Sequence, residues 1–261
     1  MRESIERTVV MVAMAGCFMG FAGVALAEEA APAPEEVRPE AEFSLDVLSQ
    51  YVWRGYALSG ENIVIQPSTT VSYQGFAFNL WGNLDTDTED ADTNSWTETD
   101  MTISYDWAMA GLDFGMGYIY YGLEGDDSQE FYGGLSKDFG FMNAGCTIYR
   151  DTDSFPGWYI ATEVGSSIPI NDDLAVDLGF TAGYLIADDT QVDGGDFSDF
   201  MDGVFSVSMT FDVAKFISVT PTVSYSFPLS SEADDLLEIS NDGYGSDEDI
   251  LYGGINMNLA F

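Results

Sequence analysis

The last stretch of the chain, Ile250-Leu251-Tyr252-Gly253-Gly254-Ile255-Asn256-Met257-Asn258-Leu259-Ala260-Phe261, alternates between two kinds of side chain. Successive side chains of an extended strand point to opposite faces. One face of this strand carries mostly polar or small residues. The other face carries the apolar residues Leu251, Ile255, Met257, Leu259 and Phe261. Such a strand separates an apolar from a polar environment, as in the wall of a membrane barrel or at the edge of a soluble sandwich.

The same alternation recurs in segments of similar length from Phe43 onward. The segment 97–107 is a clear example, because Met101 and Ile103 face away from Asp100 and its polar neighbours. The segments that we predict as strands are residues 43–56, 63–74, 75–84, 97–107, 112–122, 129–138, 139–150, 158–166, 174–186, 201–211, 216–227 and 250–261.

The links between these segments alternate between short turns and longer acidic loops. Gln74-Gly75 is a short turn, whereas residues 85–95 and 230–247 are long and rich in carboxylates. Alternating segments of ~10 residues, an even strand count and short turns on one rim are the signature of a transmembrane barrel. A soluble sandwich would not carry so uniformly polar a second face on every strand. We therefore predict an all-β fold, a transmembrane antiparallel up-and-down β-barrel of about 12 strands.

The start of the chain reads as a targeting segment. A charged stretch, Met1 to Arg7, precedes an apolar run that ends at Ala25-Leu26-Ala27, as in a secretory signal peptide. We expect a signal peptide at residues 1–27, a Pro/Ala/Glu-rich periplasmic tether at 28–42 and an outer-membrane barrel at 43–261. The competing interpretation is lipoprotein processing before Cys17, which the continuing apolar run disfavours.

Composition excludes several classes of function. Asp and Glu number 45 against 7 Lys and Arg, giving a net charge of −38, so binding to a nucleic-acid backbone is excluded. The sequence contains no His, which removes Ser-His catalysis and imidazole metal sites, so we expect neither a membrane-embedded hydrolase nor a cofactor. Weak Ca²⁺ or Mg²⁺ binding at the acidic loops stays open. The tract from Asp85 fails the EF-hand pattern because Asp90 stands where Gly is required.

Three stretches carry a resemblance to a known family: Ser49-Gln50-Tyr51-Val52-Trp53-Arg54-Gly55, then Gln66-Pro67, and Gly75-Phe76-Ala77-Phe78-Asn79-Leu80-Trp81-Gly82-Asn83. They are similar to a family of proteobacterial outer-membrane barrels first catalogued as a conserved protein of unknown function. Its members carry a signal peptide, a Tyr-x-x-Arg-Gly-like element in the first strand and a Gly-Phe…Trp-Gly element in the third. The resemblance covers residues 43–85 well and implies an outer-membrane barrel without implying a chemistry.

The final strand also resembles the terminal strand of bacterial outer-membrane barrels, which docks on the barrel-assembly machinery and closes onto the first strand. We therefore expect Phe261 to act in assembly. Pro67 and Pro221 each remove a ladder hydrogen bond in mid-strand, and we predict bulges there. The aromatic residues that we expect in an outward-facing girdle are Tyr51, Trp53, Tyr73, Trp107, Tyr118, Tyr120, Trp158, Tyr184 and Tyr225.

The polar faces of the strands would line the lumen. Rings of Asp and Glu favour cations, so we predict a porin-like channel for passive passage of small solutes, with a preference for cations. The alternative is a closed structural or surface-interaction barrel whose acidic loops act outside the cell. Arg54 would be a lone guanidinium among the acidic side chains of the lumen, so it must be paired, either in a structural ion pair or with a bound solute. The residues that we expect along the solute path are Arg54, Asn79, Trp81, Glu98, Asp100, Asp106, Asp113, Glu163 and Asp177.

Overall fold

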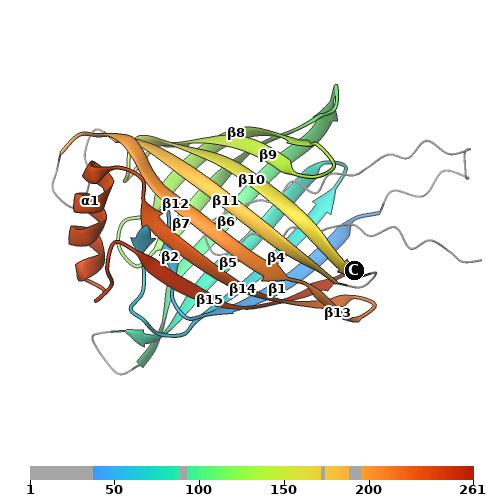
Figure 1. Ribbon diagram of the computed structural model, residues 1–261, viewed down its shortest axis with the longest axis horizontal. Helices are drawn as coiled ribbons and strands as arrows, with labels where there is room; N and C mark the ends of the chain where they lie inside the picture. The colour runs from blue at the N-terminus through green and yellow to red at the C-terminus, as the bar shows by residue number, and fades with distance from the viewer. Residues whose placement is uncertain (1–37, 89–92, 172–173, 188–194) are drawn as a thin grey trace, which may run out of the picture.

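The computed structural model describes residues 38–88, 93–171, 174–187 and 195–261, and in it the chain forms a closed antiparallel barrel (Figure 1). The wall strands follow one another in sequence order, and the first strand, β1 (Glu40–Leu48), pairs with the last, β15 (Ile250–Ala260). Strands β12 (Phe197–Met209) and β13 (Phe211–Ala214) both pair with β14 (Ile217–Pro228) and act as one interrupted strand. The wall therefore has 12 strands, which confirms the predicted fold.

The other elements complete the wall and its interior. A short hairpin is formed by β2 (Val52–Trp53) and β3 (Tyr56–Ala57), and the helix α1 (Ser231–Asp242) lies between β14 and β15. The remaining wall strands are β4 (Val64–Tyr73), β5 (Phe76–Thr88), β6 (Thr93–Met109), β7 (Leu112–Leu123), β8 (Ser128–Asp138), β9 (Asn143–Asp151), β10 (Gly157–Asn171) and β11 (Leu174–Ala187).

The two rims of the barrel differ in the length of their connections. Two-residue turns with positive φ join β4 to β5 at Gln74-Gly75 and β6 to β7 at Ala110-Gly111. This backbone geometry matches the twist of paired strands, so it closes a hairpin tightly. The longer connections, with α1, lie at the opposite end from the C-terminus (Figure 1). The predicted alternation of short and long links is confirmed, but the loop predicted at 85–95 is wrong in extent, because β5 runs to Thr88 and β6 begins at Thr93. In barrels of this type the short turns face the periplasm.

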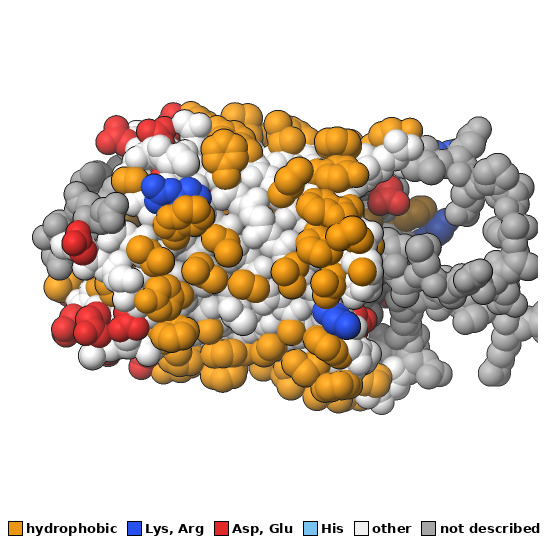
Figure 2. All heavy atoms as spheres, turned by 90° about the horizontal axis from the view of Figure 1, so that it is seen from above, with side chains coloured by type: hydrophobic (Ala, Val, Ile, Leu, Met, Phe, Trp, Pro, Cys, Tyr) orange, Lys and Arg blue, Asp and Glu red, His pale blue; other side chains and the backbone are white. Residues whose placement is uncertain are grey.

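The outer surface of the barrel is apolar. Phe78, Ile103, Val207 and Leu251 are among the large hydrophobic side chains exposed there. On the face that Figure 2 shows, hydrophobic side chains cover the middle of the barrel, while Asp and Glu lie toward its ends. Lipid is the solvent that such a surface requires, so this is the outward face of an outer-membrane barrel. None of the helices in the described residues is long and apolar enough to cross a membrane.

The first predicted strand is wrong beyond Leu48. Strand β1 begins at Glu40, inside the predicted tether, and ends at Leu48, after which the chain turns into the barrel. Tyr51 and Trp53, expected in the outer girdle, therefore lie inside. Tyr51 is 4% exposed because its hydroxyl and ring find partners on the inner wall. The signal peptide and most of the tether lie outside the described residues.

The rest of the predicted girdle stays on the outer face. Tyr73, Trp158 and Tyr225 are exposed there. Tyr118 and Tyr120 alternate along β7 with Ile119 and Tyr121, which are buried inside the barrel. The same alternation along their strands places Trp107 and Tyr184 outside.

The predicted bulges at Pro67 and Pro221 are also wrong. Pro67 keeps its register with β1, and Pro221 keeps its register with β15. Each proline instead interrupts the hydrogen-bonded ladder with its other neighbouring strand, which is β5 for Pro67 and the interrupted β12–β13 strand for Pro221. The gap beside Pro221 lies opposite Thr210, where the β12–β13 strand is interrupted. A missing N–H thus costs pairing with one neighbour only, so no extra residue has to be inserted.

Closure of the barrel predicts a role for Phe261. Its backbone N–H donates to Ala41 O at 2.9 Å, and its ring lies 6.5 Å from that of Phe216. Deletion of Phe261 should reduce the heat-modifiable folded form on a gel, because these closing contacts are lost. Phe141→Ala is the control, since Phe141 is an exposed aromatic residue of the same rim. Equal folding of the deletion variant and the control would contradict this role.

Candidate functional site

The inner wall of the barrel is polar and densely hydrogen-bonded. Gln66 and Asn83 are fully buried and joined by a 3.0 Å hydrogen bond between β4 and β5. Asn256 donates to Asp46 at 2.9 Å across the closing seam between β15 and β1. These side chains come from the polar phase of each strand, because alternation sends the apolar phase to the lipid.

Residues 52–57 form an inner hairpin that crosses the bore. Arg54 and Gly55 have φ of 52° and 88°, which makes a tight turn at its tip. Its base packs through Val52 and Ala57 on Ile250 and Tyr252 of β15. Its tip reaches Glu130 on β8, and β8 lies half the ring of strands away from β15. The inner hairpin therefore bridges opposite walls and narrows the passage.

Arg54 is the centre of the contacts at the tip of the inner hairpin. Its Nη1 and Nη2 donate to the two carboxylate oxygens of Glu130 at 2.7 and 2.8 Å. Its guanidinium carbon lies 4.2 Å from the ring centroid of Trp53, 4.8 Å from that of Tyr149 and 4.2 Å from that of Tyr159. The side chains of Arg54 and Glu130 are 12% and 2% exposed. The pair is a bidentate, desolvated ion pair, the geometry for which Arg is suited.

Helix α1 holds the inner hairpin from the end that carries the long loops (Figure 1). The helix begins after Ser230, whose hydroxyl accepts a hydrogen bond from Ala233 N. Asn241 accepts from Ala57 N at 2.9 Å and donates to Gly55 O at 3.2 Å. Leu237 lies so close to Gly55 that a Cβ there would meet it at 2.9 Å. The helix and the inner hairpin therefore form one packed unit within the mouth.

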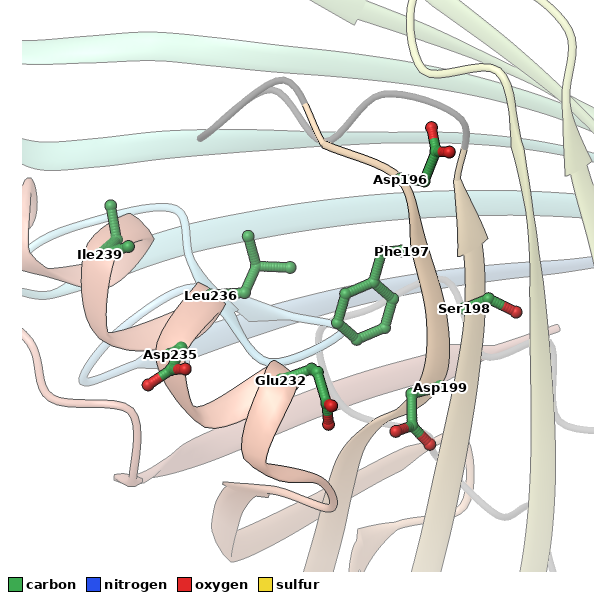
Figure 3. A pocket seen from close by; sticks show the side chains of 8 residues that line it. All are labelled: Asp196, Phe197, Ser198, Asp199, Glu232, Asp235, Leu236 and Ile239. Atoms are coloured by element: carbon green, nitrogen blue, oxygen red, sulfur yellow. The ribbon is translucent and has the colours of Figure 1, made fainter.

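A shallow cavity of about 300 Å³ lies at that mouth between α1 and the start of β12 (Figure 3). Phe197, Leu236 and Ile239 form its apolar part. Four carboxylates line it as well, so the mouth of the barrel is acidic. Among the described residues, no group of three or more acidic or cysteine side chains is arranged to hold a metal ion. The carboxylates in the lining are Asp196, Asp199, Glu232 and Asp235.

The candidate lumen residues predicted from the sequence lie on the inner face of the wall. Glu98 accepts from the Tyr51 hydroxyl at 3.1 Å, and Asn79 donates to Ser68 and Thr70 on the inner face of β4. Trp81 stacks near Tyr51, with ring centroids 5.6 Å apart. The residues that share the inner face by strand alternation are Asp100, Asp106, Asp113, Glu163 and Asp177.

The candidate acids do not form one cluster. Asp106 and Asp113 lie near the short β6–β7 turn, and Asp177 lies near the same rim on β11. Glu98 and Asp100 lie nearer the inner hairpin, and Glu98 accepts a hydrogen bond from Tyr51 beside it. Acids therefore line the bore on the periplasmic side of the hairpin as well as beside it.

Positive charge is nearly absent from the bore. Among the Lys and Arg residues that follow the start of β1 in the described ranges, Arg54 is the one that faces inward, and Arg38 precedes that strand. Arg150 lies on the outer face over the Trp158 ring, Lys137 is near Phe139 and Lys215 is near Phe216. Because Arg54 is already paired with Glu130, it forms no ion pair with the other inward carboxylates of the described strands.

Sequence reasoning missed most partners of Arg54. Tyr149 and Tyr159 lie against the Arg54 guanidinium, and Asp202 accepts a hydrogen bond from Tyr159; the three come from separate strands, and only the closed barrel brings them to one place. Asn241 lies in a segment expected to be a loop. A signal for the helix was present, because Ser230 is a good cap and Leu236 and Leu237 follow at helical spacing.

The sequence matches a family model described as a bacterial protein of unknown function (Gcw_chp) over residues 35–226. A comparison with curated proteins found no match.

Among solved structures, the barrel is similar to the KdgM porin, with a TM-score of 0.52 and 8% identity, covering 85% of this chain and 99% of that one. The KdgM porin in complex with disordered oligogalacturonate gives a TM-score of 0.51 at the same identity and coverage. An outer-membrane channel from Pseudomonas putida F1 gives 0.51 at 10% identity, covering 89% and 100%. At these identities the likeness shows the fold, which is that of small outer-membrane channels.

The buried ion pair predicts a large effect of Arg54→Ala on stability. Removing the guanidinium leaves Glu130 buried without its counter-charge, which costs about 3–5 kcal/mol of unfolding free energy. Arg150→Ala is the control, because it removes one cation from the outer face and should cost at most about 1 kcal/mol. Urea unfolding of the refolded protein in lipid vesicles, followed by tryptophan fluorescence, measures both. Equal losses in the two variants would contradict a special role for Arg54.

Proposed function

The chain belongs to the Gcw_chp family of bacterial proteins of unknown function, and we propose that it is a narrow outer-membrane channel for small solutes with a preference for cations. The observation that carries this proposal is the charge of the bore. Inward carboxylates such as Asp106, Asp113 and Asp177 face a lumen whose one described cationic side chain, Arg54, is already paired.

The physical basis of the preference is field focusing. The wall around the bore is thin, and lipid of low dielectric constant lies outside it, so the field of the inward acids is concentrated along the passage. Acids occur at the mouth, beside the inner hairpin and near the periplasmic rim. A cation is thus attracted along the whole path, whereas an anion meets repulsion at each level.

The size of the barrel supports a small conductance. Porins with 16–18 strands hold open aqueous channels, and a 12-strand barrel is narrower. The inner hairpin restricts the passage further, because Arg54 at its tip reaches Glu130 on β8, and Tyr51, just before the hairpin, reaches Glu98 on β6. We therefore propose passage of ions and small solutes rather than of bulky ones.

The related structures support a channel and leave the solute open. The KdgM porin has been seen with oligogalacturonate, a polyanion. The acidic bore of this chain favours the opposite charge, so we propose small cations or uncharged solutes for it. A role without catalysis fits a sequence without His, and Phe261 is the proposed contact with the barrel-assembly machinery.

A second candidate function is a closed structural or surface-interaction barrel. The observation that favours it is the inner hairpin, which joins β15 to β8 across the bore and is held by Asn241 of α1. In that case the acidic mouth would act as a binding surface. Weak binding of Ca²⁺ or Mg²⁺ at the loops would accompany either role.

Recordings in planar bilayers test the two candidates. With asymmetric KCl, the reversal potential should show preference for K⁺, at small single-channel conductance. Asp106→Asn together with Asp113→Asn should lower the K⁺/Cl⁻ permeability ratio, on the order of two-fold, because two inward charges are lost. Arg54→Ala should raise the ratio, because it leaves Glu130 unpaired.

Asp126→Asn is the matched control, since Asp126 is exposed in the β7–β8 loop at the far rim. Preference for Cl⁻ would show that the charge of the bore has been assigned wrongly. Absence of any conductance would favour the closed barrel.

A further inference from the structure

The contacts of Arg54 divide into those made within the inner hairpin and those made with the barrel wall. Trp53 and Arg54 belong to the inner hairpin, whereas the other partners belong to the barrel wall. We define the wall site by five residues on the strands β7 to β10 and on β12, which is separated from β10 by β11. They are Tyr121 on β7, Glu130 on β8, Tyr149 on β9, Tyr159 on β10 and Asp202 on β12.

We propose that the wall site is a binding site for guanidinium-bearing solutes and that Arg54 is its built-in occupant. The inference rests on the proposed channel only for the way in which a solute reaches the site. A soluble guanidinium would take the place of the Arg54 side chain, against the same carboxylate and the same rings.

The wall site is held in shape by contacts that do not involve Arg54. The hydroxyl of Tyr121 donates to Glu130 Oε2 at 2.8 Å, which fixes the carboxylate. The hydroxyl of Tyr159 donates to Asp202 Oδ1 at 2.9 Å, which fixes its ring. Tyr149 packs on Tyr159, with ring centroids 6.2 Å apart. A site whose groups are fixed by their neighbours does not have to be reordered when it binds a new ligand.

The geometry of the wall site selects a guanidinium over other cations. The two oxygens of Glu130 receive two parallel N–H bonds, at 2.7 and 2.8 Å, which a planar fork can supply and an ammonium cannot. The rings of Tyr149 and Tyr159 lie within 4.8 Å of the guanidinium carbon and attract a flat cation. An alkali ion would have to lose its hydration without gaining either contact.

The burial of Glu130 makes an empty wall site unfavourable. At 2% exposure, its carboxylate cannot be solvated by bulk water, so it requires a cationic partner. In the native chain, Arg54 supplies that partner at high effective concentration, because Asn241 holds the inner hairpin in place. A solute can compete only weakly with Arg54, so the site is best revealed when Arg54 is absent.

Chemical rescue tests the proposal. Arg54→Ala removes a side chain whose charged end is reproduced by methylguanidinium. We expect millimolar methylguanidinium chloride to raise the unfolding midpoint of Arg54→Ala in detergent micelles, and tetramethylammonium chloride at equal ionic strength to have no such effect. Calorimetric titration of the variant should show saturable binding of methylguanidinium. The wild-type protein, whose site is occupied, should show neither effect.

The double variant Arg54→Ala/Glu130→Gln is the matched control, because it keeps the cavity and removes the charge. Its affinity for methylguanidinium should be lower by about tenfold or more. If Arg54→Ala does not stay folded, its refolding yield with methylguanidinium against tetramethylammonium is the readout. Equal effects of the two cations, or equal binding by the double variant, would overturn the proposal. These measurements need no conductance, so a closed barrel would leave the binding site standing.

Discussion

Pairing of β1 with β15 is the constraint on which the rest of the structure depends. In lipid, every backbone N–H and C=O must find a partner within the protein, and a sheet satisfies this only when it has no free edge. The seam runs from Leu48 opposite Gly254 to Glu42 opposite Ala260. Once the sheet is closed, strand alternation decides on which side of the wall each side chain lies. The apolar phase meets lipid, and the polar phase is confined to a bore.

The charged side chains inside the bore must then be stabilised by other side chains of the protein. Arg54 and Glu130 do so for each other, and their pair ties the inner hairpin to the far wall, while Asn241 ties it to α1. No other inward acid of the described strands forms an ion pair with Arg54. The same feature therefore narrows the passage and uses the positive charge of Arg54, as the proposed cation preference requires. This combination fits a small cation-preferring channel better than a wide porin.

The sequence predicted the wall because the wall obeys a local rule. Met101 and Asp100 take opposite faces by alternation alone, and the resulting inward phase of the candidate acids agrees with the structure. Tyr51 and Trp53 were assigned wrongly because alternation continues past Leu48 while the chain turns inward. Nothing local marks Arg54 as a residue with positive φ. Its partners depend on register over several strands, which no short pattern encodes.

The most direct test of the central claim is the electrostatic potential inside the bore. Asn79 lies on the inner face near the periplasmic rim, and Cys146 is the cysteine to remove from the background by Cys146→Ser. The rates at which Asn79→Cys reacts with a cationic and an anionic methanethiosulfonate reagent of similar size report the local potential. We expect the cationic reagent to react faster than the anionic one, with a ratio of rates about tenfold or more above that of a free thiol. Equal rates, or a faster anionic reagent, would contradict it.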